Sequence, residues 1–324
     1  MSIDTVVIGA GWAGLTAARV MAAAGRTVVV LEKARGPGGR SATRRTEGAR
    51  FDHGAQYFTA RSAAFGRQLQ QWQDAGLVQP WRPKLAVIGD KAAHSDPEEV
   101  SRFVGVPGMN AVCRHFAADL DCRFEQRVAA LEFDRQWHLE LISGEQLQAR
   151  RLLITLPPAQ TAALLGESDP LHDPIAGITF NPCIAGMVSF RKPFDPGFDA
   201  AFINHSGALS WVACNSSKPE REGNDWVLHA SADWSRAQLE APTEQHAERL
   251  AEAFGELVGE PLPAMAGCTA HRWRYAQACY PLERGTITDA DRRLAIAGDW
   301  LSGSRVEGAW TSGRKAGEWL ANLD

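Results

Sequence analysis

The apolar runs at the start of the chain predict a β-α-β unit. Residues 3–8 form a short β-rich run that ends at Gly9, and residues 27–31 form a second apolar run typical of a buried strand. Strong helix formers fill residues 12–24 between them, and Gly25 is suited to end a helix there. The chain therefore opens with two strands joined by a helix, which places the strands parallel and side by side.

Strands continue to dominate the next predicted segment. A helix is expected at residues 108–120, followed by short strands near residues 122–133, 137–142 and 151–156. The Pro-Pro pair that follows the last of these strands ends it and marks a crossover out of the first domain.

A different pattern extends over residues 163–272. Strand-like runs there precede one amphipathic helix at residues 243–259, which is typical of a mostly antiparallel sheet with helical cover. The chain then returns to a buried strand at residues 294–298 and a final helix at residues 306–320. This order predicts a second domain inserted into the first.

Composition and charge exclude several classes of partner. The formal net charge is −4 without a basic block, so neither nucleic acid nor an anionic membrane is expected as a partner. The six cysteines and nine histidines lack CxxC, HxH and HxxxH spacing, which predicts no metal site and buried free thiols in a reducing compartment. The start of the chain lacks the pattern of a signal peptide, and the apolar stretch after it is interrupted by Arg19 and Arg26, so we expect a cytoplasmic protein. No protein partner can be inferred.

The first motif that carries chemistry is a GxGxxG run, Gly9-Ala10-Gly11-Trp12-Ala13-Gly14, between the first strand and the first helix. The first glycine permits a tight turn, the second lets the backbone approach a pyrophosphate, and the third allows close packing of helix and strand. Glu32 ends the second strand, where a carboxylate accepts hydrogen bonds from a ribose. The motif therefore predicts a dinucleotide site.

A second glycine-rich stretch indicates that the dinucleotide is FAD. Glu32-Lys33 leads into residues 35–40, which end in Gly39-Arg40, and the block continues to Ala55-Gln56-Tyr57. An NAD site does not need this extension. FAD is longer and does need it, because its flavin ring must lie further along the edge of the sheet. Arg40 would donate to the pyrophosphate, and the backbone of residues 55–57 would approach the flavin ring. The alternative is a surface loop with solvated arginines.

The last segment of the predicted site follows the buried strand at residues 294–298. Gly298-Asp299 would place a carboxylate against the ribityl hydroxyls of FAD, and Arg305-Val306 begins a helix whose amides would face the pyrimidine edge of the ring. As an alternative, Asp299 caps a helix near Ser302. The complete predicted FAD set is Gly9, Gly11, Trp12, Ala13, Gly14, Glu32, Lys33, Gly39, Arg40, Ala55, Gln56, Tyr57, Val128, Gly298, Asp299, Arg305 and Val306.

The predicted fold class is α/β, with a Rossmann-type FAD-binding domain and an inserted, mostly antiparallel α+β substrate domain, an arrangement that resembles amine oxidases and p-hydroxybenzoate hydroxylase. The FAD-binding domain is assigned to residues 1–75, 98–162 and 273–324, and the substrate domain to residues 76–97 and 163–272.

The motifs together resemble the amine-oxidase-like flavoprotein superfamily. The EKxxGPGGR stretch, the DHGAQYF run and the AGDW…EGAW segment carry this resemblance, and the run HRWRYAQ at residues 271–277 is similar to the bacterial renalases within it. The resemblance implies oxidation of NAD(P) isomers reduced at ring position 2 or 6, with dioxygen as the final acceptor and hydrogen peroxide as the product. It also implies non-covalent FAD, because the amine oxidases that attach flavin use a cysteine near the terminal FAD segment and no cysteine follows Cys279.

Hydride transfer to flavin needs no general base, so no catalytic side chain is assigned: the flavin carries the chemistry. The segment after Gln56 could line the substrate cleft, although Thr59 could instead cap a helix and Arg61 could be solvated. Trp273 and Arg274 could wall the ring or pack between the domains, while His94, His205 and His229 are expected to be structural. The predicted substrate set is Tyr57, Phe58, Thr59, Ala60, Arg61, Trp273 and Arg274.

Two other functions remain open. A true amine oxidase of this fold typically holds the amine between two aromatic side chains, often tyrosines, and keeps a lysine near the flavin. This chain has three tyrosines, and Lys192 lies in a turn-like run. A non-enzymatic scaffold, as in relatives that chaperone small GTPases, would have lost the flavin contacts, whereas Arg40, Gln56 and Asp299 are present.

Overall fold

The structure is a computed structural model that describes residues 2–46, 48–89, 100–204 and 207–323. The chain divides into two compact units. The first contains Met1–Gly39, Val112–Thr179 and Gln277–Asp324, and the second contains Arg40–Ala111 and Phe180–Ala276.

These boundaries differ from the predicted domain boundaries. Residues 40–75, 98–111 and 273–276, assigned from sequence to the FAD-binding domain, group with the second unit, and residues 163–179, assigned to the substrate domain, group with the first. The physical reason is that Asp52 and its neighbours hydrogen-bond to side chains of residues 215–221.

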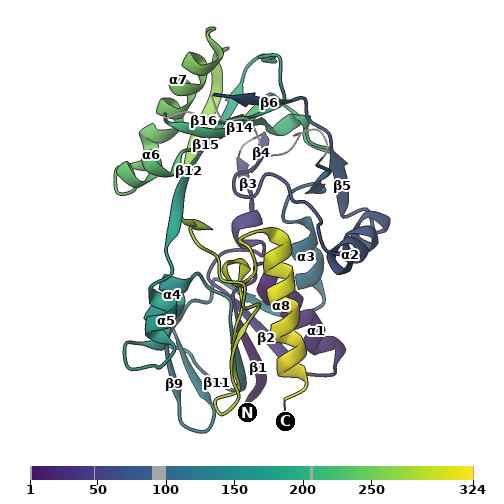
Figure 1. Ribbon diagram of the computed structural model, residues 1–324, viewed down its shortest axis with the longest axis vertical. Helices are drawn as coiled ribbons and strands as arrows, with labels where there is room; N and C mark the ends of the chain where they lie inside the picture. Colours follow the sequence, from purple (N-terminus) through teal and green to yellow (C-terminus); the bar gives the residue numbers. More distant parts are fainter. Residues whose placement is uncertain (1, 47, 90–99, 205–206, 324) are drawn as a thin grey trace. The chain divides into compact units, whose positions relative to one another are not determined.

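A mixed sheet forms the framework of the first unit (Figure 1). In the described chain it has eight strands, with the path β17-β18-β11-β1-β2-β8 and with β10 joining β9 to β11. The consecutive strands β18, β11, β1, β2 and β8 pair in parallel. The strands are β1 (Ile3–Ile8), β2 (Val28–Glu32), β8 (Asp121–Phe124), β9 (Val128–Phe133), β10 (Trp137–Leu141), β11 (Gln146–Ile154), β17 (Ile287–Asp289) and β18 (Leu294–Ile296).

The register of this sheet brings the predicted motifs to one edge. Ile8 of β1 pairs with Leu31 of β2 and Ile154 of β11, and Ile154 pairs with Ile296 of β18. The residues that follow these four strands therefore lie along the same carboxyl edge, where open α/β sheets bind their ligands. Strand β18, residues 28–31 of β2 and residues 152–154 of β11 are continuous apolar runs, because parallel strands are buried on both faces.

Two helices of this unit pack so closely that only glycine fits between them. A Cβ added to Gly313 of α8 would lie 2.2 Å from the Ala13 carbonyl oxygen of α1, and one added to Gly317 would lie 2.8 Å from the Ala17 carbonyl oxygen. The final helix is thus held against the first (Figure 1). The helices of this unit are α1 (Trp12–Ala23), α3 (Ala111–Ala118, which begins at the unit boundary), α4 (Pro158–Leu165), α5 (His172–Ala176) and α8 (Val306–Ala321).

The second unit contains a six-stranded sheet in the order β16-β12-β15-β14-β13-β6 among the described residues. The pairings of β12, β15, β14 and β13 are antiparallel, whereas β13 and β6 are parallel. The described part of this unit also has two antiparallel pairs of strands, β3-β4 and β5-β7. The strands are β3 (Thr43–Thr46), β4 (Ala49–Asp52), β5 (Val78–Trp81), β6 (Leu85–Ile88), β7 (Arg102–Gly105), β12 (Phe180–Phe190), β13 (Ala200–Ile203), β14 (Leu209–Cys214), β15 (Asp225–Ala230) and β16 (Met265–Ala278).

Helical cover of this sheet is confirmed. Leu250 and Phe254 of α7 are fully buried, and the Phe254 ring lies 4.9 Å from the Trp226 ring of β15 between centroids. The amphipathic helix begins three residues later than expected, because residues 243–245 form a 3₁₀ turn. The helices are α2 (Ala63–Asp74), α6 (Ala232–Ala237) and α7 (His246–Val258).

Local structure refines the predicted strand near residues 122–133, which is two strands. Glu125 between them has φ = 58°, a left-handed conformation that interrupts an extended run. Of the six cysteines, Cys113 is buried and the other five are partly exposed, so the expectation of buried thiols holds for one of them. No helix in the described part of the chain is long and apolar enough to cross a membrane.

Candidate functional site

The GxGxxG turn in the first unit has a separate geometric reason for each glycine. Gly9 has φ = +108°, a conformation that favours glycine. A Cβ on Gly14 would lie 2.0 Å from the Gly9 carbonyl oxygen, so helix and strand touch there. A Cβ on Gly11 would have no heavy atom within 4 Å, which leaves open space above its backbone. Each glycine thus has the geometry that its assigned role requires.

Glu32 anchors this turn from the end of β2. Its two carboxylate oxygens accept hydrogen bonds from the Ala10 amide at 2.9 Å and the Ala34 amide at 2.8 Å, and the residue is 8% exposed. An ionised carboxylate has about four acceptor positions, so these amides leave capacity for a ribose hydroxyl. Glu32 therefore has a structural role that the sequence did not indicate, besides the predicted one.

The second glycine-rich stretch folds back onto the first. The Gly38 amide donates to the Ala10 carbonyl oxygen at 2.9 Å, and a Cβ on Gly39 would lie 3.5 Å from the Gly11 Cα. This contact favours a shared role for the two stretches over an independent surface loop. Lys33 is exposed and donates to the Gln160 side chain at 3.3 Å, while Val128 is buried at the start of β9.

The terminal segment of the first unit forms a tight turn after β18. The Asp299 carbonyl oxygen accepts hydrogen bonds from the Ser302 and Ser304 amides at 2.9 and 2.8 Å, and the Gly298 amide donates to the Ser312 hydroxyl. The Ser302 amide is therefore bonded to the backbone of Asp299, whereas a helix cap would use the side chain of Asp299. Asp299 is 5% exposed. Arg305 is the N-cap residue of α8, and Val306 is its first residue.

These first-unit features fit a bound dinucleotide. The N-cap residues of helices α1 and α8, Gly11 and Arg305, make no side-chain cap hydrogen bond. The first turn of a helix presents unpaired N–H groups and the positive end of its dipole, which favour an anionic group. The open space over Gly11 lies at the start of α1, where a pyrophosphate could approach the backbone.

The remaining motif segments meet in the second unit. The Ala55 amide donates to the Arg40 carbonyl oxygen at 2.8 Å, and a Cβ on Gly54 would lie 2.0 Å from that oxygen. The Arg40 guanidinium donates to the Ala276 carbonyl oxygen at 3.1 Å. The Trp273 indole N–H donates to the His53 carbonyl oxygen at 3.0 Å. Arg40, residues 53–55 and residues 273–276, far apart in sequence, are thus bonded together within this unit.

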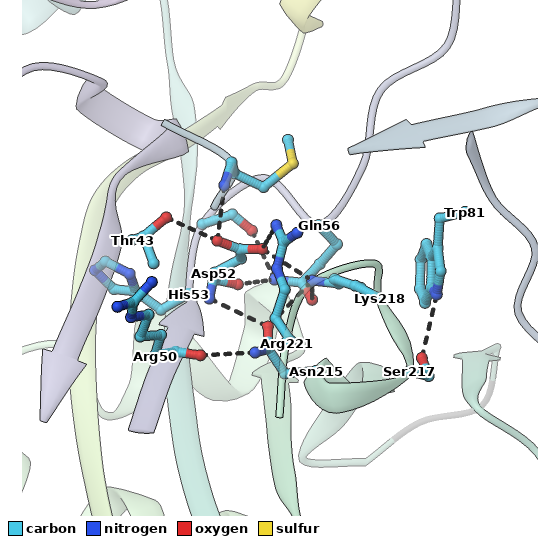
Figure 2. Close-up of polar contacts among 12 residues, drawn as sticks. Thr43, Arg50, Asp52, His53, Gln56, Trp81, Asn215, Ser217, Lys218 and Arg221 are labelled. Carbon is cyan, nitrogen blue, oxygen red and sulfur yellow. Dashed lines mark hydrogen bonds and ion pairs between the residues drawn. The ribbon is translucent and has the colours of Figure 1, made fainter. Parts of the chain in front are cut away.

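A buried ionic cluster lies in the same unit (Figure 2). Asp52 has no exposed surface and accepts hydrogen bonds from Thr43, the Met109 amide and Arg221, at 2.8, 2.9 and 2.7 Å. Lys218 lies 3.7 Å from the same carboxylate. Burial raises the pKa of Asp52, but the charges of Lys218 and Arg221 outweigh this effect and hold the pKa below its usual range.

Lys218 is the functional candidate that the sequence analysis missed. Its ammonium group is fully buried. It donates to the side-chain oxygen of Gln56 at 3.2 Å and to the side-chain oxygen of Asn215 at 3.4 Å (Figure 2). Burial lowers the pKa of Lys218 to about 8, although Asp52 opposes this shift. The sequence argument considered Lys192 alone, because Lys218 lies in a polar run that has the composition of an exposed loop.

The side-chain amide of Gln56 is engaged within the second unit. Its NH₂ group donates to the carbonyl oxygens of Asp52 and Gly54, and its oxygen accepts from Lys218. The side chain therefore positions the lysine and the loop, and contact of the Gln56 backbone with FAD remains a prediction.

Three histidines of this unit are held neutral. Burial, followed by the neighbouring His271, Arg44 and His229, lowers the pKa of His53 to about 3. Burial likewise lowers the pKa values of His229 and His271 to about 4. The His271 ring lies 4.2 Å from the Trp273 ring between centroids, and His229 contacts the His53 carbonyl oxygen at 3.2 Å. His229 is structural, as expected, while His94 and His205 lie outside the described residues.

The predicted substrate segment divides between core and cleft positions. Phe58 is 4% exposed and packs on Phe65 and Phe103, so its ring belongs to the core and cannot line a cleft. Tyr57 is half-buried and packs against Trp81 and Trp211. The chain continues through Thr59 and Ala60, both half-buried, to the exposed Arg61. Helix α2 is capped by the Ser62 hydroxyl, so the alternative of Thr59 as the cap is wrong.

The structure contradicts the assignment of Arg274 to the substrate cleft. Neighbouring residues of a strand point to opposite faces, so Trp273 and Arg274 of β16 cannot line one cleft together. Trp273 packs on His53, whereas Arg274 is exposed and forms a bidentate ion pair with Glu240. Arg274 is therefore a surface residue and Trp273 remains the candidate.

Comparison with known proteins agrees with these features. Residues 85–318, well over half of the chain, match the family described as flavin containing amine oxidoreductase, and residues 7–72 match the NAD(P)-binding Rossmann-like domain. The chain is 36% identical to the hydroxyneurosporene desaturase of Rubrivivax gelatinosus over 121 residues, which are 31% of this chain and 23% of the relative. It is 50% identical to the putrescine oxidase of Kocuria rosea over 56 residues, 17% of this chain and 12% of the relative. The matches thus span about a quarter or less of these relatives.

Solved structures share the fold over nearly the whole chain. A putative protoporphyrinogen oxidase from Exiguobacterium sp. 255-15 has a TM-score of 0.78 at 12% identity, with 99% of both chains covered. A putrescine oxidase bound to putrescine has a TM-score of 0.74 at 13% identity, also with 99% of both chains covered. These similarities establish a Rossmann-type domain combined with an amine-oxidase-like domain.

Proposed function

Because the chain belongs to the flavin containing amine oxidoreductase family, we propose that it oxidises misreduced dihydronicotinamides, the 2- and 6-dihydro isomers of NAD(P). Family membership makes the protein a flavin-dependent oxidoreductase with FAD as its cofactor. The finer assignment rests on the second unit and on the resemblance of residues 271–277 to the renalases. The products would be NAD(P)⁺ and hydrogen peroxide.

The sign of the buried charge carries this proposal. Asp52 supplies one negative charge, whereas Lys218 and Arg221 supply two positive charges, and all three side chains are at most 2% exposed. The nearby histidines are neutral because burial lowers their pKa values. An electropositive interior favours an anionic dinucleotide and disfavours a cationic amine.

The roles of the residues follow from these contacts. Gly9, Gly11 and Gly14 would let FAD come close to the backbone at the start of α1. Glu32 would bind the adenosine ribose. Bound FAD supplies the acceptor for the hydride and the route of its electrons to dioxygen. The junction of Arg40, Ala55 and Trp273 would fix the orientation of the nicotinamide ring, which hydride transfer requires.

The amine-oxidase alternative keeps one specific observation in its favour. The buried Lys218 is the kind of residue that amine oxidases of this fold keep near the flavin, and relatives described as putrescine oxidase and monoamine oxidase match parts of the chain. Against it, Asp52 is the carboxylate of the buried cluster and is already bonded to two cations.

Kinetic measurements of anaerobic flavin reduction separate the two functions. If the substrate transfers a hydride directly, the rate should vary little across about pH 6 to 9, and only deuterium at the transferred carbon should slow it. A sigmoid near the Lys218 pKa of about 8, together with a solvent isotope effect, would contradict the proposal. The control is the same pH series with a simple amine as reductant.

A further inference from the structure

Arg102, the first residue of β7, is a buried arginine of the second unit that none of the motifs includes. It is 7% exposed, and its Nη1 donates to the Val100 carbonyl oxygen at 2.9 Å, while its Nε is buried without a hydrogen-bond partner. The other buried arginines of the described chain, Arg151 and Arg221, each form an ion pair with an aspartate. Arg102 has no such pair among the described residues. A buried guanidinium without a counter-charge is costly, so its other contacts must explain its place in the fold.

The guanidinium of Arg102 lies over the ring of Tyr57. Its Cζ is 5.4 Å from the centroid of that ring, which is within the range of a cation–π contact. The Tyr57 ring also packs on Trp81 and Trp211, at 6.1 and 5.8 Å between centroids. Both tryptophans are at most 6% exposed, whereas Tyr57 is half-buried. Tyr57 is therefore the ring of this group that a ligand can touch, and Arg102 would act on the ligand through it.

A second ring of the group also has a cation of the protein beside it. Trp81 of β5 pairs with Arg102 in the strand register, and the Lys218 ammonium lies 5.5 Å from the centroid of its ring (Figure 2). An aromatic group that binds a cationic amine offers the negative faces of its rings to the ammonium. Here cations of the protein already lie over Tyr57 and Trp81, so an ammonium that approached Tyr57 would be repelled.

We propose that Arg102 is a specificity-determining residue, which excludes cationic amines from the ring of Tyr57. A neutral dihydronicotinamide ring can still pack against Tyr57, because aromatic packing needs no positive charge on the ligand. The phosphates of the same substrate are attracted by the cation behind the ring. The inference rests on the proposed function, since it places Tyr57 on the substrate side of that site.

The dissociation constants of benzylamine and benzyl alcohol for the FAD-loaded protein test this role, because the two probes share a ring and only the amine is charged at about pH 7. The unaltered protein should bind benzyl alcohol more tightly than benzylamine, and this comparison needs no substitution. Arg102→Met should tighten benzylamine binding about 10-fold, because it removes the repelling charge, and should leave benzyl alcohol binding unchanged. Arg102→Lys keeps the charge and should bind both probes as the unaltered protein does.

Arg45→Met is the matched control, because it removes the same charge from an exposed position of β3 in the same unit. It should leave the ratio of the two dissociation constants unchanged. The role of Arg102 is overturned if Arg102→Met has the same ratio as Arg45→Met, if Arg102→Lys behaves like Arg102→Met, or if the unaltered protein prefers benzylamine or binds neither probe. Oxidation of dihydronicotinamides is measured on the same samples. Oxidation without an effect of Arg102 on the ratio removes only this role, whereas an Arg102-dependent ratio without oxidation removes only the proposed function.

Discussion

The two units build their candidate sites from different materials. In the first unit the site consists of backbone groups. Gly11 has open space above it, α1 begins without a side-chain cap, and Glu32 accepts a hydrogen bond from a backbone amide of the turn. In the second unit it is a set of buried side chains, in which Asp52 bonds to Lys218 and Arg221. A backbone site depends on where side chains are absent, whereas a side-chain site depends on how charges are paired after burial.

This difference decides what each unit tolerates. Loss of one member of a buried ionic cluster leaves an uncompensated charge, while a methyl group in a glycine turn acts through contact alone. The predictions below test this contrast.

The largest effect is expected for Asp52→Asn in the second unit. It leaves Lys218 and Arg221 buried without a carboxylate and should lower the free energy of unfolding by about 3–5 kcal/mol. Urea denaturation measures this loss. Asp233→Asn in the same unit, which removes an exposed ion pair with Arg236, should cost less than about 1 kcal/mol. Equal losses would mean that the buried cluster does not stabilise the unit.

A smaller and separable effect is expected for the glycine turn. Gly14→Ala would place a Cβ 2.0 Å from the Gly9 carbonyl oxygen and should destabilise the flavin-free protein by about 1–3 kcal/mol. Gly11→Ala meets no atom within 4 Å, so its Tm without flavin should be unchanged while its flavin content falls. Full flavin content in Gly11→Ala would contradict the placement of FAD over this turn.

Two carboxylates of the first unit test the assigned contacts with FAD. Glu32→Gln and Asp299→Ala should each weaken FAD binding by about 1.5–3 kcal/mol, because each removes a charged hydrogen-bond partner. Glu32→Gln should also lower the Tm of the flavin-free protein, since Glu32 accepts from two backbone amides. The ratio of flavin to protein absorbance after purification measures occupancy, and full occupancy in both variants would exclude these contacts.

The most gradual effect is a pH dependence from the second unit, which needs no substitution to be seen. The pKa values of His53, His229 and His271 lie at about 3 to 4, below their ordinary 6.5. As the pH falls from 6.5 to 4, the unfolded chain binds protons that the folded chain does not, so the free energy of unfolding falls. Each histidine contributes a slope of at most about 1.4 kcal/mol per pH unit. His229→Gln should flatten the slope in this window, and an unchanged slope would show that His229 is not held neutral.

The same contrast explains what the sequence could predict. The parallel strands and glycine turns of the first unit could be predicted from local patterns. Gly9, Gly11 and Gly14 are required by the geometry of a backbone turn that spans only a few residues. The cluster of Asp52 with Lys218 and Arg221 joins residues more than 160 positions apart, as does the bond of Trp273 to His53. No local signal marks such pairs. The prediction of Arg274 as a substrate residue was wrong because Trp273 and Arg274, which are neighbours on one strand, were assigned to the same face.

Anaerobic reduction of the bound flavin, followed near 450 nm (about the usual flavin maximum), tests the central claim most directly. The 2- and 6-dihydro isomers of NAD(P) should bleach the flavin faster than ordinary NADH or any simple amine, including putrescine. Ordinary NADH carries its hydride at ring position 4, away from the accepting position, and misplacement costs several powers of ten in rate. Faster bleaching by NADH or by an amine would contradict the proposed function and favour an amine oxidase of the same fold.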